Sequence, residues 1–405
     1  MTESLTAEVE QLDAGFFQDP HGCFARLREE GPVTQVRMPD GHRVWLVTRY
    51  ADVRAALADP RLYKDWAGKL TKPGWEPDPA TSILGMHMLN TDPPDHTRLR
   101  KLVNKAFTAR RIARLRPRIE EITASLLDAL AERVAAGETE VDLIKAFAFR
   151  LPITVICELL GVPADDQASF KAWTQTVLSG TGAQEEILSA GMSMYQYLTR
   201  LIAAKRESPA DDLVSALIAA RDSGDSLSER ELIAMLFLLL IAGHETTVNL
   251  IASGTLALLD HPDELGRLRK DPSLIPAAVE EMLRYCNPLN HATERFTLEP
   301  VEIGGVTIPA REWVLCALAS ANLDPGRFPG ADRFDVGRDT TGHLAFGYGI
   351  HFCIGAPLAR LEAEIAFGAL LSRFPGLSLA VPRSSLRWKP SSLIHGLESL
   401  PVRLP

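Results

Sequence analysis

The spacing of hydrophobic residues along the chain predicts a protein built mostly of helices. Apolar side chains recur at intervals of three and four residues in most segments, and this repeat places them on one face of an α-helix. Alternating segments are shorter and predict two hairpins, residues 33–38 with 43–47 around the turn Pro39-Asp40-Gly41, and residues 301–308 with 313–317. The predicted helices cover residues 96–107, 112–136, 147–160, 226–259, 276–286 and 354–373.

The longest of these helices is hydrophobic on every side in its middle, residues 236–242. It begins with Ser226 and Glu229 in the spacing of a capping box and runs to Leu259. At about 1.5 Å per residue it is roughly 50 Å long, enough to cross the molecule. Since a helix that is apolar all round is buried, polar residues near its centre need a specific reason.

The length of the chain, 405 residues, allows two or three domains, but no linker, change of composition or repeat divides it. Hydrophobic residues make up 46% and charged residues 23%, which are ordinary proportions for a globular protein with a sizeable core. We therefore expect a single domain over residues 1–405, mainly α with minor β-sheets.

The N-terminal residues and the cysteines indicate a soluble, cytoplasmic protein without a membrane anchor. The segment M-T-E-S-L-T-A-E-V-E lacks the basic start and apolar core of a signal peptide. The longest apolar run, residues 232–243, is well below the roughly 20 residues that span a bilayer. The cysteines are widely spread without a C-x-x-C pair, which fits neither a disulfide framework nor a zinc knuckle. They are Cys23, Cys157, Cys286, Cys316 and Cys353.

Residues 346–355, F-G-Y-G-I-H-F-C-I-G, present one cysteine, Cys353, in surroundings that suit an iron-bound thiolate. Gly347 and Gly349 let the backbone take turns that a side chain forbids. The following residues have helical periodicity, with Pro357 in the first turn. Cys353 is thus expected to start a helix, where free N–H groups and the helix dipole favour thiolate over thiol. The alternative is a glycine-rich turn around a buried structural cysteine.

The full spacing F-x-x-G-x-x-x-C-x-G occurs at Phe346, Gly349, Cys353 and Gly355, and it resembles the haem-binding loop of the cytochrome P-450 superfamily. The resemblance covers nearly the whole chain and is greatest to soluble actinobacterial enzymes that hydroxylate macrolides and other large natural products. It implies the P-450 fold, a single triangular-prism domain with a long central helix over the haem. It also implies haem b (iron protoporphyrin IX), with the Cys353 thiolate as the axial iron ligand and with Phe346, Gly347 and Gly355 against the cofactor.

The polar centre of the longest predicted helix reads A-G-H-E-T-T and resembles the oxygen-activation motif of the same family. The resemblance implies that Ala242 and Gly243 make room for O₂ and that Glu245 and Thr246 relay protons; an acid beside a hydroxyl in an apolar helix suits that task. We also expect the Thr246 hydroxyl to bond to the Ala242 carbonyl and loosen the helix. The alternative is a helix cap or a solvated patch. A zinc peptidase is excluded because H-E-x-x-H would need histidine at Val248.

Glu281 and Arg284 lie three residues apart on a predicted helix and therefore share a face. On an ordinary helix they would form a surface ion pair. In the resembling family this E-x-x-R pair joins a later arginine, which the sequence D-R-F supplies as Arg333. The resemblance implies that the three residues support the fold behind the haem and take no part in the chemistry.

Two histidines and two arginines are the expected partners of the haem propionates. His96 and Arg100 lie four residues apart in D-H-T-R-L-R, on one face of a predicted helix. His351 precedes the cysteine by two residues and Arg295 follows the E-x-x-R helix, at positions where the resembling family binds propionates. Two arginines and two neutral donors suit two carboxylates at a protein edge. Taken singly, each residue is more often an ordinary solvated side chain.

A basic stretch contrasts with the acidic chain as a whole. Nine lysines and arginines and no acid occur from His96 to Arg118, although the chain carries a formal net charge of −9 and a pI of about 5.7. Such an asymmetry favours an anionic partner. The stretch lacks aromatic interleaving and nucleic-acid motifs, so we expect a small ferredoxin, with a 2Fe–2S or similar cluster, to dock near the segment from Arg98 to Arg118. A solvated basic face is the alternative.

The expected substrate is large and mostly apolar, such as a macrolide, a terpenoid or a sterol. Two segments should cover the distal side as movable lids: the loop of residues 59–90, which carries Trp66, Trp75 and Met86, and the glycine-containing region 177–197. Methionine and leucine at such positions are more often ordinary core residues. The expected pocket residues are Met88, Leu89, Leu239, Leu289, Asn290, Ala292, Leu393 and Ile394.

Three positions depart from the family pattern without removing a residue that the chemistry needs. Leu323 stands in N-L-D-P where N-R-D-P is usual, Arg311 holds a turn position usually held by glycine, and Tyr348 replaces a common histidine. The first two are expected to alter local stability, and Tyr348 is expected to modulate the loop around the cysteine.

Together these features predict a monomeric haem-thiolate monooxygenase. The enzyme would insert one atom of O₂ into an unactivated C–H or C=C bond, using electrons from NAD(P)H delivered by a ferredoxin reductase and a ferredoxin. A peroxygenase or isomerase is a second possibility, but such enzymes typically lack the acid–alcohol pair of Glu245 and Thr246. A haem-binding sensor or carrier is a third, and it would have no use for a proton relay.

Overall fold

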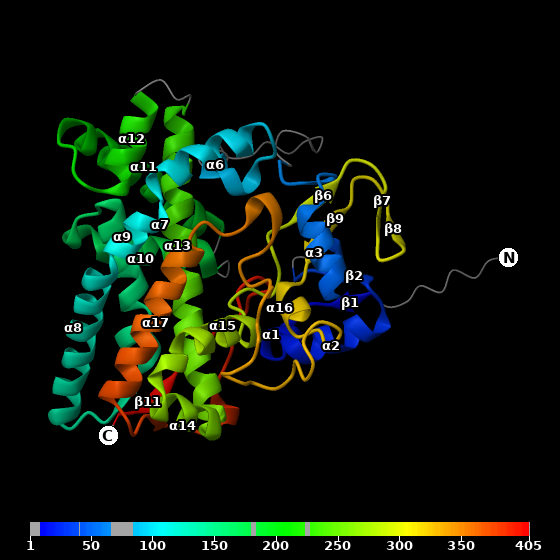
Figure 1. Cartoon of the computed structure of the whole chain (residues 1–405). Coiled ribbons are helices and arrows are strands. Elements are labelled where there is room, and N and C mark those ends of the chain that lie inside the picture. The colour runs from blue at the N-terminus through cyan, green and yellow to red at the C-terminus, as the bar shows by residue number, and fades with distance from the viewer. Residues whose placement is uncertain (1–8, 40, 66–83, 180–183, 223–226, 405) are drawn as a thin grey trace. The chain divides into compact units, whose positions relative to one another are not determined.

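The computed structural model describes residues 9–39, 41–65, 84–179, 184–222 and 227–404, and it confirms a mainly helical chain with small sheets (Figure 1). The longer helices are α2 (Pro20–Glu30), α3 (Tyr50–Ala58), α6 (Asp95–Ala106), α8 (Arg116–Ala135), α9 (Arg150–Leu160), α10 (Gln167–Ser179), α11 (Gln184–Glu207), α12 (Leu213–Asp222), α13 (Glu229–Asp260), α14 (Pro262–Lys270), α15 (Ile275–Tyr285) and α17 (Ala356–Arg373). Shorter helical segments include α1 (Ala14–Gln18), α7 (Ala109–Arg114), η2 (Ile144–Ala148), α16 (Leu318–Asn322) and η5 (Gly349–His351). The strands are β1 (Glu10–Gln11), β2 (Val33–Arg37), β3 (Arg43–Val47), β4 (Leu62–Tyr63), β5 (Glu140–Asp142), β6 (Arg295–Thr297), β7 (Val301–Ile303), β8 (Val306–Ile308), β9 (Trp313–Cys316), β10 (Ser378–Leu379) and β11 (Pro401–Arg403).

Most predicted helices agree with the structure to within three residues, but the helix predicted over 112–136 is divided. Its first part belongs to α7 and the rest forms α8, with Leu115 between them. Pro117 lies in the first turn of α8, where the missing N–H of proline costs no hydrogen bond. The proline therefore begins a new helix at a point where the hydrophobic spacing alone runs on.

The capping box at the start of α13 lies two residues later than predicted. The N–H of Ser228 donates to Glu231 Oε2 at 2.7 Å, and the N–H of Glu231 donates to Ser228 Oγ at 3.2 Å. The predicted cap, Ser226, lies outside the described residues. Both serines have a glutamate three residues on, so the sequence signal alone does not choose between them.

The apolar centre of α13 is largely buried, but not on every side as predicted, because Phe237 and Ile241 are half-buried and Ala242 is exposed. Among the described helices α13 is long and apolar enough to cross a membrane, but 67% of its most hydrophobic 18-residue window is covered by the rest of the protein. Leu236, Leu240 and Ile251 are each 0–1% exposed. This burial is the property of a core helix.

Two compact units divide the chain by packing, and each is assembled from segments that are distant in the sequence. The first unit contains Met1–Lys64, Ser253–Cys353 and Ser384–Glu398, and the second contains Asp65–Ala252, Ile354–Arg383 and Ser399–Pro405. Because the chain passes repeatedly from one unit to the other, a linker of distinct composition is not expected at any boundary. The single domain over residues 1–405 stays a prediction.

The first unit is organised around a sheet with the strand order β1-β2-β3-β9-β6-β4. β2 and β3 form the first predicted hairpin, in which Val33 lies opposite Val47 and Arg37 opposite Arg43. β9 runs parallel to β3 and antiparallel to β6. This arrangement fixes Arg295, the first residue of β6, next to the centre of the sheet.

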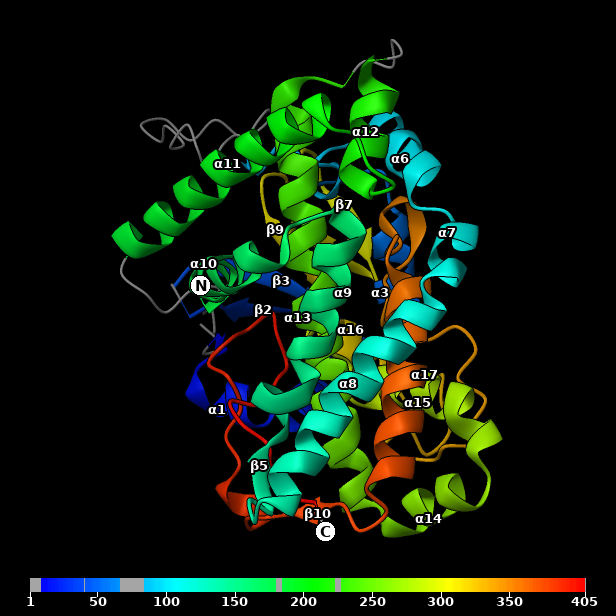
Figure 2. The same ribbon diagram turned by 90° about the vertical axis from the view of Figure 1, so that its left-hand side faces the viewer.

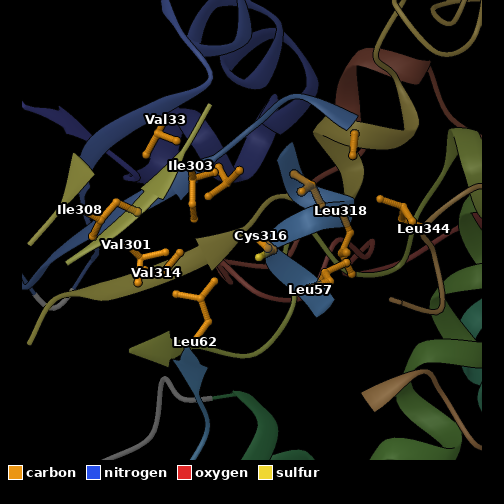
Figure 3. Packing of buried hydrophobic residues seen from close by; sticks show 14 residues of the cluster. Val33, Leu57, Leu62, Val301, Ile303, Ile308, Val314, Cys316, Leu318 and Leu344 are labelled. Atoms are coloured by element: carbon orange, nitrogen blue, oxygen red, sulfur yellow. The ribbon is translucent and has the colours of Figure 1, made fainter. Parts of the chain in front are cut away.

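Hydrophobic side chains from this sheet and from the neighbouring helices form one cluster (Figure 3). Val33 and Val314 come from the sheet, Leu57 from α3, and Leu318 from α16, all of them 0–7% exposed. Leu344 joins the same cluster from the segment that leads to the cysteine loop. The segment that leads into the cysteine loop is therefore anchored in the core of the first unit.

The second predicted hairpin is wrong in its pairing. β7 and β8, which were expected to form a single arm, pair with each other in a separate two-stranded sheet, and β9 joins the larger sheet (Figure 1). The chain turns between β7 and β8 at Gly304 and Gly305, whose φ angles are 59° and 81°. Two consecutive residues with positive φ make the tight turn that joins antiparallel strands. Arg311 also has a positive φ, 66°, which explains why glycine suits that position.

The second unit consists mainly of helices that pack side by side. α17 lies along α8 (Figure 2), and α10 lies along α11. α9 approaches α13 so closely that a Cβ on Gly243 would lie 3.0 Å from the Ile156 side chain. A small sheet with the order β10-β11-β5 completes the unit. A larger residue at position 243 would therefore require the Ile156 side chain to move.

Candidate active site

The loop around Cys353, in the first unit, is held by hydrogen bonds and by close packing. The N–H of Cys353 donates to the carbonyl of Phe346 at 2.9 Å. Gly347 and Gly349 have φ of 72° and 79°, in the left-handed region that favours glycine. A Cβ on Gly349 would lie 2.9 Å from the carbonyl oxygen of Leu57 in α3. The predicted need for glycine is confirmed at both positions.

Cys353 precedes α17 but does not start it, so that prediction is wrong by three residues. The helix begins at Ala356, with Gly355 as its N-cap and Pro357 in its first turn. The N–H of Cys353 is already used by the Phe346 carbonyl, which keeps the cysteine in the loop. The free N–H groups of the first helical turn therefore belong to the residues that follow it.

Cys353 differs from the other cysteines in its exposure. It is exposed, whereas Cys157, Cys286 and Cys316 are buried and Cys23 is half-buried. Burial raises the pKa of Cys157 to about 12 and that of Cys23 to about 11, and it also raises the pKa of Cys286 and Cys316. Metals bind the thiolate and not the thiol. Among the five cysteines, Cys353 is the one whose exposed position fits an axial iron ligand.

Tyr348, which replaces a common histidine, ties the cysteine loop to α3. The Nη2 of Arg54 donates to the Tyr348 hydroxyl at 2.7 Å, and the guanidinium lies 4.2 Å from the centre of the ring. The loop also presents Ile350 and Phe352 to solvent, with 51% and 40% of their surface exposed. The outer face of the loop is therefore apolar and is anchored at one end by a cation–π contact.

Among the predicted propionate residues, Arg295 and His351 belong to the first unit. Arg295 is 4% exposed in β6, opposite Val314 of β9, and His351 is half-buried at the end of η5. The hydrogen bond from Arg61 lowers the pKa of Asp59, and burial raises the pKa of Cys316; the charge of Arg295 adds slightly to the first shift and opposes the second. A buried guanidinium on a fixed strand is well suited to hold a carboxylate.

His96 and Arg100 belong to the second unit and lie one turn apart on α6, as predicted. His96 is 3% exposed and Arg100 is half-buried. Burial, with a smaller contribution from the charge of Arg100, lowers the pKa of His96. His96 is therefore neutral at pH 7, as expected of a neutral hydrogen-bond donor.

The A-G-H-E-T-T motif lies within the continuous helix α13. Thr246 Oγ1 donates to the carbonyl of Ala242 at 3.1 Å, which confirms the predicted bond. Glu245 is 9% exposed, whereas Ala242 is exposed and Thr246 is half-buried. An acid that is almost buried thus lies next to a half-buried threonine whose hydroxyl is bonded back to the helix.

Sequence reasoning missed two polar residues of the same helix. Nδ1 of His244 lies 2.9 Å from the carbonyl of Leu240, and its ring packs edge-on against Phe149. Asn249 is 0% exposed and contacts Glu245. The available signal was polar residues recurring at a helical spacing of four in an apolar segment.

The ion pair between Glu281 and Arg284 is confirmed as a buried structural element, with both side chains 0% exposed. Nε of Arg284 donates to Glu281 at 2.6 Å and Nη2 at 2.7 Å, and its Nη1 donates to the carbonyls of Asn322 and Ala331 at 2.9 and 2.8 Å. Such a network fixes α15 against the segment that follows α16.

The third arginine of this network is Arg338, and the assignment to Arg333 needs correction. Nε of Arg338 donates to Glu281 Oε1 at 3.2 Å, and its side chain is 12% exposed. Arg333 has an exposed side chain and contributes its backbone carbonyl, which accepts from Arg284 at 3.2 Å. The turn at residues 329–335 points the Arg333 side chain outward, and this could not be read from the D-R-F motif.

Several predicted pocket residues meet in the first unit. Leu289 and Ile394 form a bridge, and the N–H of Asn290 donates to the carbonyl of Leu393 at 2.8 Å. The N–H of Ala292 donates to Cys316 of β9. Asn290 is 1% exposed and its amide donates to the carbonyl of Ser392 at 3.0 Å, so its observed role is to join the two segments.

The other pocket and lid predictions concern the second unit. Met88 and Leu239 are each 6% exposed and Leu89 is half-buried. Trp66 and Trp75 lie outside the described residues, as does the segment 180–183. The remainder of the region 177–197 belongs to α10 and α11, and a Cβ on Gly191 of α11 would lie 3.7 Å from Leu84. The segment before α6 therefore packs against α11.

The basic stretch from Arg98 to Arg118 is partly neutralised by acids of the same helices and of distant segments. Lys101, Arg110 and Arg114 are exposed and make no ion pair with any residue in the described ranges. The observed pairs are Arg98 with Asp95 and Glu231, Arg111 with Asp211, Arg116 with Glu120 and Glu364, and Arg118 with Glu121 and Glu158.

Comparison with known proteins assigns the chain to a family. The family model described as Cytochrome P450 matches residues 9–379. The chain is 52% identical to the cytochrome P450 monooxygenase PikC of Streptomyces venezuelae, over 99% of this chain and 96% of that protein. It is 46% identical to the 6-deoxyerythronolide B hydroxylase of Saccharopolyspora erythraea, over 96% and 97% of the two chains.

A solved structure agrees with these relatives. The tirandamycin C-bound P450 monooxygenase TamI is 52% identical, covers 98% of this chain and 100% of its own, and superposes with a TM-score of 0.90. Members of this family bind haem b and use O₂ with electrons derived from NAD(P)H and delivered by redox partners. The chain therefore belongs to the cytochrome P450 family and is a haem-thiolate monooxygenase.

Proposed function

We propose that this monooxygenase hydroxylates or epoxidises a large, mostly apolar natural product, a macrolide-like polyketide in preference to a terpenoid or a sterol. The 6-deoxyerythronolide B hydroxylase and the tirandamycin C-bound TamI support a polyketide. The apolar character of Met88, Leu239, Leu289 and Ile394 supports a substrate with few charges.

Cys353 is the proposed axial ligand, and the observation that carries the proposal is its exposure in a loop fixed by Phe346 and Gly349. When bound, the haem iron supplies the oxidation chemistry, as cofactors do in such enzymes. Phe346, Gly347 and Gly355 are assigned to contact with the macrocycle. Propionate binding is assigned to His96, Arg100, Arg295 and His351.

Glu245 and Thr246 are proposed to move protons, and Ala242 with Gly243 to leave space beside them. The Thr246 hydroxyl donates its proton in a hydrogen bond to the Ala242 carbonyl, so its oxygen can accept a hydrogen bond from a second group. To pass a proton on, the hydroxyl has to leave the carbonyl and turn toward the acceptor. Glu245 is buried enough to exclude bulk water and has a neighbouring amide that can hold its carboxyl. Replacing Thr246 by alanine should therefore increase the release of peroxide at the expense of product.

The electron donor is proposed to be a small acidic ferredoxin that contacts Lys101, Arg110 and Arg114. These three side chains support the proposal because their charge is exposed and uncompensated by the described residues, unlike that of Arg98 or Arg118. A single cytoplasmic, monomeric domain over residues 1–405 completes the proposal.

The ferrous–CO difference spectrum of the purified enzyme tests the ligand. The wild type should give the red-shifted Soret band of thiolate ligation, and Cys353→Ala should lose it, while Cys23→Ala serves as a control that keeps it. An unshifted band in the wild type would reject thiolate ligation.

The substrate class is tested separately by following the iron spin state while the enzyme is titrated with macrolactones, sterols and terpenoids. A response confined to sterols would contradict the polyketide assignment.

A further inference from the structure

A histidine of the first unit links helix α15 to the segment that leads into the cysteine loop. Nε2 of His343 lies 3.0 Å from Oε2 of Glu280, which belongs to α15. The backbone N–H of Ala345 donates to Nδ1 of the same ring at 3.2 Å. The ring of His343 therefore joins a carboxyl group of the helix to the backbone two residues further along its own segment.

The bond from Ala345 fixes which ring nitrogen of His343 carries the proton. A backbone N–H can only donate, so Nδ1 accepts and has no proton of its own. The N–H group of the imidazole then lies on Nε2, which donates to the carboxyl of Glu280. Both nitrogens are used, and the ring is held in one orientation.

The contact between His343 and Glu280 is largely shielded from water. The side chain of His343 is 5% exposed and that of Glu280 is 27% exposed. A hydrogen bond to an ionised carboxylate is roughly twice as strong as one between neutral groups. Glu280 also has a further interaction besides this bond, so its position does not depend on the histidine alone. It can therefore serve as the anchor from which His343 is held.

A second link joins α15 to the residue that follows the histidine. Oδ1 of Asn322 accepts from the N–H of Leu344 at 2.6 Å, and the carbonyl of Asn322 accepts from Nη1 of Arg284 at 2.9 Å. Glu280 and Arg284 are four residues apart and share a face of α15. That face of the helix therefore fixes two consecutive residues, His343 directly and Leu344 through Asn322.

The segment held in this way supplies the acceptor for the N–H of Cys353. The carbonyl of Phe346 accepts this bond at 2.9 Å, and Phe346 follows Ala345 directly. The rings of His343 and Phe346 lie 6.1 Å apart, centre to centre, at an angle of 49°. Because each residue has only two soft backbone dihedrals, a displacement of the Ala345 N–H is passed on to the next carbonyl. The position of His343 thus bears on the backbone of the cysteine.

We propose that His343, anchored by Glu280, is a positioning residue for Cys353. It holds the Phe346 carbonyl where the N–H of the cysteine binds, and it thereby limits the movement of the thiolate away from the iron. The inference rests on the proposed axial role of Cys353 and goes beyond it by naming the side chains that hold the backbone of the ligand. The effect is on how long the sulfur stays bound and not on the oxidation itself.

The test follows the ferrous–CO complex of the haem-loaded protein, whose red-shifted band gives way to an unshifted band when the thiolate leaves the iron. His343→Leu removes both ring bonds and should lose the red-shifted band about tenfold faster than the wild type, a change of about 1.4 kcal/mol in the barrier. His343→Gln keeps a donor for Glu280 and should recover part of this difference.

His261→Leu is the matched control. His261 is also a half-buried histidine of the first unit, its Nδ1 lies 2.8 Å from the carbonyl of Ala257, and its ring packs against Tyr285 of α15 and against Phe334. The variant removes a comparable ring from the same side of the protein and should keep the wild-type rate. Equal acceleration in His261→Leu and His343→Leu would show general loosening and overturn the positioning role.

A double-mutant cycle with Glu280→Gln identifies the route. If His343 acts through its bond to Glu280, the two changes together should accelerate the loss of the band by less than the product of their separate effects. Effects that multiply would overturn the proposal, as would the absence of any recovery in His343→Gln.

The same spectra separate this inference from the axial role of Cys353. If the wild type shows only the unshifted band, the axial role fails and the inference fails with it. If the wild type shows the red-shifted band and His343→Leu keeps it equally long, the ligand stands and the inference alone is rejected.

Discussion

Replacing Arg338 with alanine tests which arginine completes the buried network of Glu281 and Arg284. Nε of Arg338 donates to Glu281 Oε1 at 3.2 Å. Its two Nη groups donate to three backbone carbonyls in residues 329–333 at 2.7, 2.8 and 3.1 Å. The alanine variant removes all of these bonds and leaves the Arg284 contacts with Glu281 in place.

The bonds set the size of the effect. Each hydrogen bond contributes about 0.5–1.5 kcal/mol net, so four of them amount to about 2–4 kcal/mol once water replaces some of the carbonyl contacts. The loss should be smaller than for Arg284→Ala, which leaves the fully buried Glu281 with the charge of Arg338 and the N–H of Asp335 and should cost about 3–5 kcal/mol. Arg333→Ala should cost less than about 0.5 kcal/mol, because its side chain is exposed and its carbonyl remains.

Thermal unfolding of the haem-loaded variants measures the difference. At about 2.1 cal/mol/K per residue, a chain of 405 residues shifts its melting temperature by only about 1 °C per kcal/mol. Arg338→Ala should therefore melt about 2–5 °C below the wild type, and Arg333→Ala should melt at the wild-type temperature. Arg284→Ala should yield little or no protein with the thiolate-type ferrous–CO band. The assignment of Arg338 to this network would be contradicted if Arg333→Ala were as destabilising as Arg338→Ala, or if the Arg338 variant melted like the wild type.

Three further predictions concern single positions. Gly349→Ala should lose haem and the red-shifted ferrous–CO band, because a Cβ would meet the Leu57 carbonyl oxygen at 2.9 Å. Gly347→Ala, with a φ of 72° and no atom within 4 Å of the new Cβ, should be affected less, and equal haem retention in the two variants would contradict this. Burial raises the pKa of Glu362 well above its usual 4.5, so the folded state keeps a proton that the unfolded chain releases, and stability falls as the pH rises above 4.5. The melting temperature of Glu362→Gln should therefore rise relative to that of the wild type between about pH 5 and 8. Parallel pH profiles of the two proteins would argue against this role of Glu362. Burial lowers the pKa of His291 to about 4, so on acidification the unfolded chain binds a proton at this residue before the folded protein does, and stability is lost as the pH falls from 6.5 to about 4. The melting temperature of His291→Phe should therefore fall less steeply than that of the wild type over this pH range.

The features that the sequence determined are those that depend on neighbouring residues. The glycines around Cys353, the polar centre of α13 and the bond from Thr246 to Ala242 all involve side chains within a few residues of one another. Backbone conformation and helical spacing fix such contacts, whatever the rest of the chain does. For the same reason most helix positions and the first hairpin agree with the structure.

The tertiary structure decided which of several equivalent residues is used. Arg338 and not Arg333 reaches Glu281, because the turn before it directs one arginine inward and the other to solvent. Acids from distant helices neutralise much of the basic stretch, as Glu158 does for Arg118. Such pairings depend on where remote segments meet in the fold. Electrostatic and packing energies depend on the distance between atoms in space and not on the number of residues between them along the chain. The contact of Asn249 with Glu245, one turn away, belongs with the local features, but the burial of Asn249 was fixed only when the helices packed around it.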